Sequence, residues 1–250
     1  MRLFFIAFQF LTIIPLPFSI RCEEEDLGRS MALFPLVGLV LGAGLVGLNF
    51  LLTPLFPRPV ADLLLIVALA AVTGALHLDG LADVCDGIAA RGSRERFLEV
   101  MKDSRVGPVG AVGLILCLLL KYETLLQVPL AVKKEALLLF PLFARFCQVQ
   151  MTVGARRARN DGLGAVFVGG AGVRQFIVAY VITLSAAYLL MGMEGIYCAL
   201  ILYLFTWGLK TWSHRRLGGI TGDVIGCASE LNEVVALLAV LALSEMRTIM

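Results

Sequence analysis

Charged residues are scarce in this chain of 250 residues, where Asp, Glu, Lys and Arg together make up only 16%. A soluble domain normally has about 25%. Hydrophobic residues make up 59% of the chain, and the mean hydropathy is +0.90. One globular core cannot bury so much apolar surface. The composition therefore excludes a soluble domain and a disordered chain, and it predicts a multi-pass membrane protein.

Other features are absent as well. The 21 basic and 19 acidic residues leave a net charge of only +2, so no overall field attracts a nucleic acid. The 6 cysteines form no CxxC pair or regular ladder, and the 2 histidines lie far apart in the sequence. Neither a disulfide framework nor a zinc site is expected.

Long apolar runs are abundant instead. A membrane-spanning helix needs about 20 mostly apolar residues. The candidate spans are 31–53, 61–78, 109–128, 135–154, 175–194, 195–213 and 231–247. The segment 3–20 is short and ends in prolines, so it spans, re-enters or lies in the interface. We expect an all-α, polytopic bundle of about seven to eight helices, with residues 1–250 forming a single integral-membrane catalytic domain.

Basic residues predict the orientation of this bundle. Fourteen lysines and arginines fall in the connections 21–30, 79–108, 154–174 and 210–230, whereas the opposite side holds Arg58, Lys121, Lys133, Lys134 and Arg247. Cytoplasmic connections are enriched in Lys and Arg. The four basic connections are therefore expected to face the cytoplasm. We expect the membrane to be the inner membrane of a bacterial or archaeal cell. Most acidic residues lie in the same connections, so polar chemistry is expected there.

Three aspartates form the most informative pattern in the chain. Asp79, Asp83 and Asp86 are spaced i, i+4, i+7. On a helix they fall within about 60° and share one face. Like charges so placed repel each other, which favours a bound cation. Carboxylates without imidazole or thiolate partners suit Mg²⁺ or Mn²⁺, and Mg²⁺ commonly completes its shell with water and substrate phosphates.

This pattern leaves two structural alternatives open. The acids could form a solvated cap that pairs with Arg91, Arg94 and Arg96. Gly80 and Gly87, beside the acids, could admit a pyrophosphate or could serve close helix packing.

Further polar residues are candidates for the same site. Lys102, Asp103 and Arg105 precede a predicted span, where Arg105 could clamp phosphate and Asp103 could be a base or a ligand. The two cations could equally be cytoplasmic anchors. His77 is a candidate base or a donor to a ligand, although a lone histidine is often simply packed.

The C-terminal half contributes acids and arginines. Asp223 and Glu230 are candidate substrate-binding acids near the start of the predicted last span, and a helix dipole alone could explain Glu230. Arg159 and Arg91 are candidate phosphate-binding residues. Arg145 lies inside a predicted span and needs a partner, for which Asp223 and Glu230 are candidates.

Two family resemblances follow from these motifs. DVCDGIAAR, from Asp83 to Arg91, resembles the opening of the CDP-alcohol phosphotransferase motif, but the rest of that motif is missing, with Val100 at an expected glycine. A longer resemblance is to the cobalamin synthase (adenosylcobinamide-GDP ribazoletransferase) family. Its blocks, in order, are FLTIIPLP (10–17), FPLVGLVLG (34–42), GALHLDGLADVCDG (74–87), MKDSRVG (101–107), ARNDGLGA (158–165) and GGITGDVIGCASELNE (218–233).

The second resemblance implies a specific reaction. It implies transfer of the cobinamide phosphate of adenosylcobinamide-GDP to a hydroxyl of α-ribazole or its 5′-phosphate, with loss of GMP. Mg²⁺ held by Asp79, Asp83 and Asp86 would stabilise the charge that develops. The alternatives are a lipid synthase of the CDP-alcohol class and a cation-coupled transporter, although no internal repeat favours a transporter. Membrane lipids surround the chain, and a homo-oligomer is left open.

Overall fold

The computed structural model describes residues 1–103, 105–159 and 161–249, and this part of the chain folds into helices without a β-strand. The prediction of an all-α bundle is confirmed. The helices are α1 (Arg2–Leu11), α2 (Glu24–Ser30), α3 (Phe34–Leu52), α4 (Arg58–Val72), α5 (Leu76–Ala89), α6 (Arg94–Val100), α7 (Pro108–Gln127), α8 (Lys133–Thr152), α9 (Leu163–Gly170), α10 (Val173–Leu217) and α11 (Gly222–Ile249).

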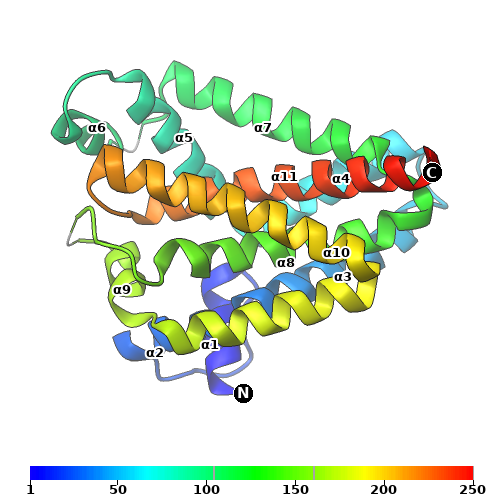
Figure 1. The fold of residues 1–250 in the computed structure, drawn as a ribbon, viewed down its shortest axis with the longest axis horizontal. Coiled ribbons are helices and arrows are strands. Elements are labelled where there is room, and N and C mark those ends of the chain that lie inside the picture. Colours follow the sequence, from blue (N-terminus) through cyan, green and yellow to red (C-terminus); the bar gives the residue numbers. More distant parts are fainter. Residues whose placement is uncertain (104, 160, 250) are drawn as a thin grey trace.

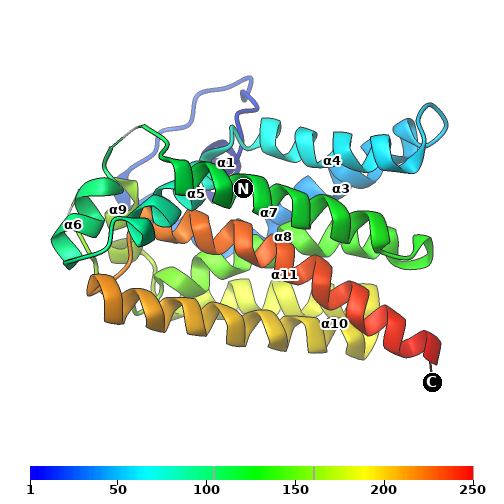
Figure 2. The ribbon, with the colours of Figure 1, turned by 90° about the horizontal axis from the view of Figure 1, so that it is seen from above.

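The long helices lie side by side along one axis of the molecule (Figures 1 and 2). Short helices α2, α6 and α9 gather at one end of this bundle, and the C-terminus lies at the other. Helix α8 occupies the middle, because it packs against α3, α10 and α11. From Ala136 to Thr152 nearly every residue of α8 is buried. A helix enclosed in this way can carry polar side chains that lipid would not tolerate.

Several helices are long and apolar enough to cross a membrane. By length and composition there are 4 in the described part of the chain: Glu24–Leu52, Pro108–Gln127, Val173–Leu217 and Gly222–Met246. Helices α4 and α5 together would make a further span, broken by a bend of 89°. The expected span 135–154 is helical as α8, but it carries Lys133, Lys134, Glu135 and Arg145 and is not among these four.

The expected adjoining spans 175–194 and 195–213 form an antiparallel hairpin within α10 (Figure 1). Gly192 makes the turn with φ +59° and ψ −135°, a conformation that favours glycine. Gly195 lies directly against the first arm, because a Cβ there would stand 2.1 Å from the carbonyl oxygen of Ala187.

Two predicted boundaries are wrong, and the N-terminal segment is resolved further. The expected span 61–78 breaks at Gly74 and Ala75, both with positive φ, and α5 then sets off in a new direction. The last helix begins at Gly222 instead of 231. The segment 222–230 is helical although it contains Gly222, Gly226 and Ser229. At the N-terminus only Arg2–Leu11 is helical, and this helix is too short to cross a bilayer.

The four connections that were expected to share one side of the membrane do lie at one end of the bundle (Figures 1 and 2). Hydrogen bonds join them across large sequence distances. Arg94 donates to the carbonyl oxygens of Leu217 and Ala158, each at 2.6 Å, and Arg216 donates to Gly92 at 2.9 Å. Two of the cations counted on the opposite side, Lys121 and Lys133, are buried in ion pairs.

Helices α5 and α11 approach each other through glycines. A Cβ on Gly80 would stand 2.6 Å from the carbonyl oxygen of Asp223, and one on Gly226 would stand 3.2 Å from the Cα of His77. Side chains would separate the two backbones. The close-packing interpretation of Gly80 is therefore confirmed, and this contact places the acid-bearing face of α5 beside the start of α11.

We predict that Gly80→Ala lowers the free energy of unfolding by about 1–3 kcal/mol, the usual cost of overpacking. The atom that the new methyl group meets is backbone and cannot rotate away. Gly47→Ala in α3 is the matched control, because a Cβ there meets nothing within 4 Å. Thermal unfolding in detergent measures both variants. Equal unfolding midpoints for the two would contradict the packing argument.

Candidate active site

The three aspartates of α5 lie on one face of the helix, as their spacing predicts, but in different surroundings. Asp79 is exposed, and Asp83 and Asp86 are half-buried. The negative charges of Asp79, Asp223 and Asp86 all act on Asp83, and Arg159 is the cation that opposes them. This corner of the protein therefore carries an excess of negative charge.

Asp86 has a structural contact of its own. Its two carboxylate oxygens accept hydrogen bonds from the backbone N–H groups of Gly107 and Gly110, each at 2.7 Å. These groups belong to the start of α7, where N–H groups lack partners within the helix. A carboxylate there also interacts favourably with the helix dipole. Asp86 thus caps α7 from a neighbouring helix.

The alternative of a solvated cap, with acids paired to nearby arginines, is wrong for the described part of the chain. Arg94 binds backbone carbonyl groups, and Arg96 pairs with Glu99 at 2.8 Å. Arg91 is exposed, with φ +40° at the end of α5, and in the described ranges it forms no ion pair or hydrogen bond with the aspartates. Its predicted role in phosphate binding stays a prediction.

A cavity of about 200 Å³ opens beside Asp79. It collects four of the predicted site residues, which come from α5, α11 and the segment before α9: His77, Asp79, Arg159 and Asp223. Asp161, Gln148 and several aromatic side chains complete the lining. The structure thus brings together residues that are far apart in the sequence.

Arg159 and Asp223 form an ion pair at the mouth of this cavity, with Nη2 and Oδ2 2.8 Å apart. The Nη1 atom of Arg159 is buried and has no partner in the described part of the chain. Lys102 bonds Asp161 at 2.7 Å, which holds the pKa of that carboxyl below its usual value. A guanidinium with a free donor suits a phosphate or hydroxyl ligand.

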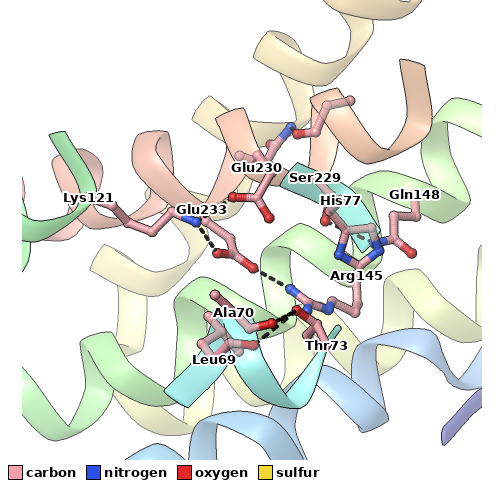
Figure 3. Close-up of polar contacts among 12 residues, drawn as sticks. Leu69, Ala70, Thr73, His77, Lys121, Arg145, Gln148, Ser229, Glu230 and Glu233 are labelled. Atoms are coloured by element: carbon pink, nitrogen blue, oxygen red, sulfur yellow. Dashed lines mark hydrogen bonds and ion pairs between the residues drawn. The ribbon is translucent and has the colours of Figure 1, made fainter. Parts of the chain in front are cut away.

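His77 lies on the floor of the cavity and is only 4% exposed. Its Nε2 stands 3.0 Å from the amide nitrogen of Gln148, which also donates to Ser229 Oγ at 2.9 Å (Figure 3). With the amide donating to Nε2, the ring proton of a neutral imidazole is on Nδ1. Nδ1 has no hydrogen-bond partner among the described residues.

Four charged side chains form a separate cluster in the interior (Figure 3). Lys121 of α7 bonds Glu230 at 2.6 Å and Glu233 at 2.7 Å, and Glu233 also pairs with Arg145 of α8. The two expected partners of Arg145, Asp223 and Glu230, are therefore wrong. Glu230 lies more than two turns after α11 begins at Gly222, so the helix-start explanation for it is wrong as well. Its predicted role in substrate binding stays a prediction.

Asp103 and Arg105 bind each other on the surface. The Arg105 side chain donates to both carboxylate oxygens, at 3.0 and 2.7 Å, and its backbone N–H adds a third bond at 3.1 Å. The Arg105 guanidinium and backbone lower the pKa of Asp103 to about 2. Asp103 therefore has little tendency to accept a proton near neutral pH. Together with Asp86 the pair lines a second, open hollow.

The donor set of the acidic face fits a hard divalent cation, because it consists of carboxylates without histidine or thiol. No three His, Cys, Asp or Glu side chains in the described part of the chain converge closely enough to enclose a metal ion. Mg²⁺ does not require this, since it commonly binds one or two carboxylates and takes its remaining ligands from water and substrate phosphates.

Sequence reasoning missed some residues of the cavity. Gln148 lines the cavity and contacts His77, and its amide also donates to Ser229; the available signal was a polar side chain inside a predicted span. The apolar wall combines Phe10, Phe34 and Phe167 from three separate segments, whose rings lie 4.6–6.0 Å apart. Nothing in the local sequence indicates that these three rings meet.

Fold and site together are those of a helical membrane protein with an acidic pocket at one end of the bundle. The family of cobalamin-5-phosphate synthases matches residues 3–241 of this chain. The chain belongs to this family.

Curated relatives agree with that assignment over almost their whole length. The chain is 63% identical to an adenosylcobinamide-GDP ribazoletransferase of Geotalea daltonii, over 97% of this chain and 98% of the relative. It is 41% identical to the enzyme of the same name from Klebsiella pneumoniae (strain 342), over 95% and 98%. It is 37% identical to that of Acetivibrio thermocellus, over 92% and 93%. No solved structure matches the fold significantly.

We predict that Glu233→Gln destabilises the protein by about 3–5 kcal/mol, because it leaves the buried cations Lys121 and Arg145 with a single carboxylate. Glu123→Gln is the control, since Glu123 is exposed and bonds only Gln127 one turn away. Unfolding midpoints in detergent compare the two variants. A Glu233 variant as stable as the Glu123 variant would contradict this assignment of the cluster.

Proposed function

We propose that this protein transfers the adenosylcobinamide phosphate of adenosylcobinamide-GDP to a hydroxyl of α-ribazole or its 5′-phosphate. The products are GMP and adenosylcobalamin or its 5′-phosphate. The observation that carries the proposal is the full-length match to relatives named for this transfer, together with family membership over residues 3–241. The acidic pocket supplies a site whose chemistry suits it.

In this reaction the acceptor oxygen forms a bond to the phosphorus next to cobinamide. The bond from that phosphorus to the oxygen of the GMP phosphate breaks, and GMP leaves with the electron pair. The proton of the acceptor hydroxyl is released to a base or to water. Phosphoryl transfer depends mainly on positioning and charge stabilisation, and needs little covalent help from the protein.

The carboxylates of α5 have the composition to hold Mg²⁺. We assign this role to Asp79, Asp83 and Asp86, with water and substrate phosphates as the remaining ligands. Bound there, Mg²⁺ would neutralise charge on the phosphates and stabilise the negative charge that develops on GMP. Asp223, held by Arg159 at 2.8 Å, adds to the negative charge that favours the ion.

Arginines bring the opposite charge to the phosphates. Nη1 of Arg159 is buried and has no partner among the described residues, so it can donate to a phosphate oxygen without giving up the bond to Asp223. Arg105 would first have to release Asp103. We therefore rank Arg159 above Arg105 as the phosphate-binding residue, and Lys102 is tied to Asp161 in the same way.

The two predicted candidates for proton transfer differ in their suitability. Asp103 has a pKa of about 2, lowered by the hydrogen bonds from Arg105, and is a weak proton acceptor. His77 lies on the floor of the cavity, with Nε2 against Gln148. We assign His77 to contact with the substrate instead of proton removal, in keeping with the small demand of this chemistry for a strong base.

The site is proposed to face the cytoplasm from a bacterial or archaeal inner membrane. The concentration of Lys and Arg in the connections at the site end of the bundle supports this orientation. Lipid would surround the apolar outer faces of the bundle. A homo-oligomer is compatible with the proposal, which assigns no role to a second copy of the chain.

The lipid-synthase alternative is not favoured. The chain matches the second half of the CDP-alcohol motif poorly, with Val100 in place of a glycine. The relatives reported above are named for ribazole transfer.

Release of GMP by the purified protein tests the proposal. We expect release from adenosylcobinamide-GDP to require both α-ribazole 5′-phosphate and Mg²⁺. Asp83→Asn should reduce the rate by more than about 100-fold, because several kcal/mol of charge stabilisation would be lost.

Glu95→Gln is the matched control, since Glu95 is an exposed acid on α6 at the same end of the bundle. It should retain the wild-type rate. A folded wild-type protein that releases no GMP would overturn the proposed reaction. Full activity in the Asp83 variant would keep the reaction but remove the metal role from α5.

A further inference from the structure

The cavity beside Asp79 has two unlike halves. Its mouth carries the charged residues Asp79, Arg159, Asp161 and Asp223. The rest of its lining is mostly apolar and aromatic, and consists largely of Phe10, Met31, Phe34, Leu76, Phe167 and Ile225. Phe10 and Phe167 have ring centroids 4.6 Å apart, so the wall is a compact aromatic cluster. A ligand with an apolar ring and a polar tail matches this division.

Buried polar atoms without partners point to a ligand in the same place. Nδ1 of His77 and Nη1 of Arg159 are both buried and unbonded in the described part of the chain, and both residues line the cavity. Buried polar groups normally have hydrogen-bond partners, so unsatisfied ones need an explanation. Both atoms are donors, His77 through the tautomer that Gln148 selects.

We propose that this cavity binds the dimethylbenzimidazole base of the acceptor, α-ribazole, with the ribose at its charged mouth. The inference rests on the proposed function, and it assigns the base of the acceptor substrate to this cavity. An apolar cavity of about 150 Å³ is enough for a benzene ring. The volume of about 200 Å³, open at the mouth, suits a methylated bicyclic ring of this kind.

The other rings brought by the two substrates fit less well. Guanine and adenine carry several hydrogen-bonding groups around the ring, and any that lie against the aromatic wall of Phe10, Phe34 and Phe167 would lose their water without replacement. The corrin ring is far larger than the cavity. Dimethylbenzimidazole has an apolar methylated edge and one free ring nitrogen, an acceptor that matches the unpartnered donors of the cavity. Base–aromatic stacking adds to the fit.

This placement also accounts for the position of the cavity next to the acidic face. A base held inside would leave its ribose hydroxyls near Asp79, Arg159 and Asp223. The hydroxyl that attacks must approach a phosphate located at those residues. Binding the base in the cavity therefore directs the acceptor towards the other substrate.

Narrowing the cavity tests the assignment. Leu76 lines it and is 46% exposed, so Leu76→Trp can be accommodated while it obstructs the space. Ile88→Trp is the control, because Ile88 is 54% exposed on the same helix and does not line the cavity. We expect Leu76→Trp to raise the KM for α-ribazole 5′-phosphate at least tenfold. The KM for adenosylcobinamide-GDP should change less than twofold, and Ile88→Trp should leave both values within twofold.

The alternatives give different results. A rise in the KM for adenosylcobinamide-GDP alone would place the guanine here and overturn the proposal. Unchanged values for both substrates would show that the cavity is not a substrate site. If the proposed reaction itself is wrong, the wild-type protein and every variant will form no product. Product formation by the wild-type protein therefore shows that any of these outcomes concerns the binding site and not the reaction.

A second measurement does not depend on turnover. In Leu76→Cys, alkylation of the new thiol by N-ethylmaleimide is followed by mass spectrometry of its peptide. Free dimethylbenzimidazole should slow this alkylation at least fivefold, and guanosine should not slow it. In the control Ile88→Cys, the rate of alkylation should be the same with either compound. Protection by guanosine, or by neither compound, would overturn the proposal.

Discussion

The pairing of charges inside the bundle is the constraint on which the arrangement of helices depends. Lys121, Arg145, Glu230 and Glu233 lie among apolar side chains, where an unpaired charge is costly. Their bonds tie α7, α8 and α11 to one another. Gly226, Glu230 and Glu233 are spaced i, i+4, i+7 and share one face of α11. The rotation of α11 about its axis that pairs Glu230 and Glu233 with the buried cations therefore also turns Gly226 towards α5. The start of α11 is brought close to α5 in the same way.

Helix α5 uses two adjacent faces for different purposes. Gly80 and Gly87 form the packing face, where Gly80 meets the backbone of α11 and Gly87 meets the ring of Phe97. Asp79 and Asp86 each precede one of these glycines by one residue, and Asp83 lies on the same side of the helix as these two acids. Because the packing face has almost no side chains, α11 comes close enough for Asp223 to join the acids of α5. The glycines carry no charge themselves, but the close approach that they permit brings several carboxylates together.

Much of this could be predicted where the signal is local. Scarce charge predicted a helical membrane bundle, the spacing of three aspartates predicted a shared face, and the distribution of arginines predicted which connections lie at one end. Long-range contacts escaped prediction. The break at Gly74 and Ala75 has no proline to mark it, and the first turns of α11 contain residues typical of a loop. The partner of Arg145 and the meeting of Phe10, Phe34 and Phe167 depend on packing between distant segments, which periodicity does not encode.

The bonds of Asp86 to α7 affect how any substitution in the DVCDG segment is interpreted. Asp83 and Asp86 look equivalent in the sequence, yet Asp86 fixes the first turn of a long helix through Gly107 and Gly110. An amide at position 86 would remove a charge and weaken an anchor in the same step. The two carboxylates are thus unequal as probes. Loss of activity at Asp86 reports on the geometry of the polypeptide as well as on its charge. Asp83 accepts no hydrogen bond from another helix in the described part of the chain, so a substitution there tests the charge alone.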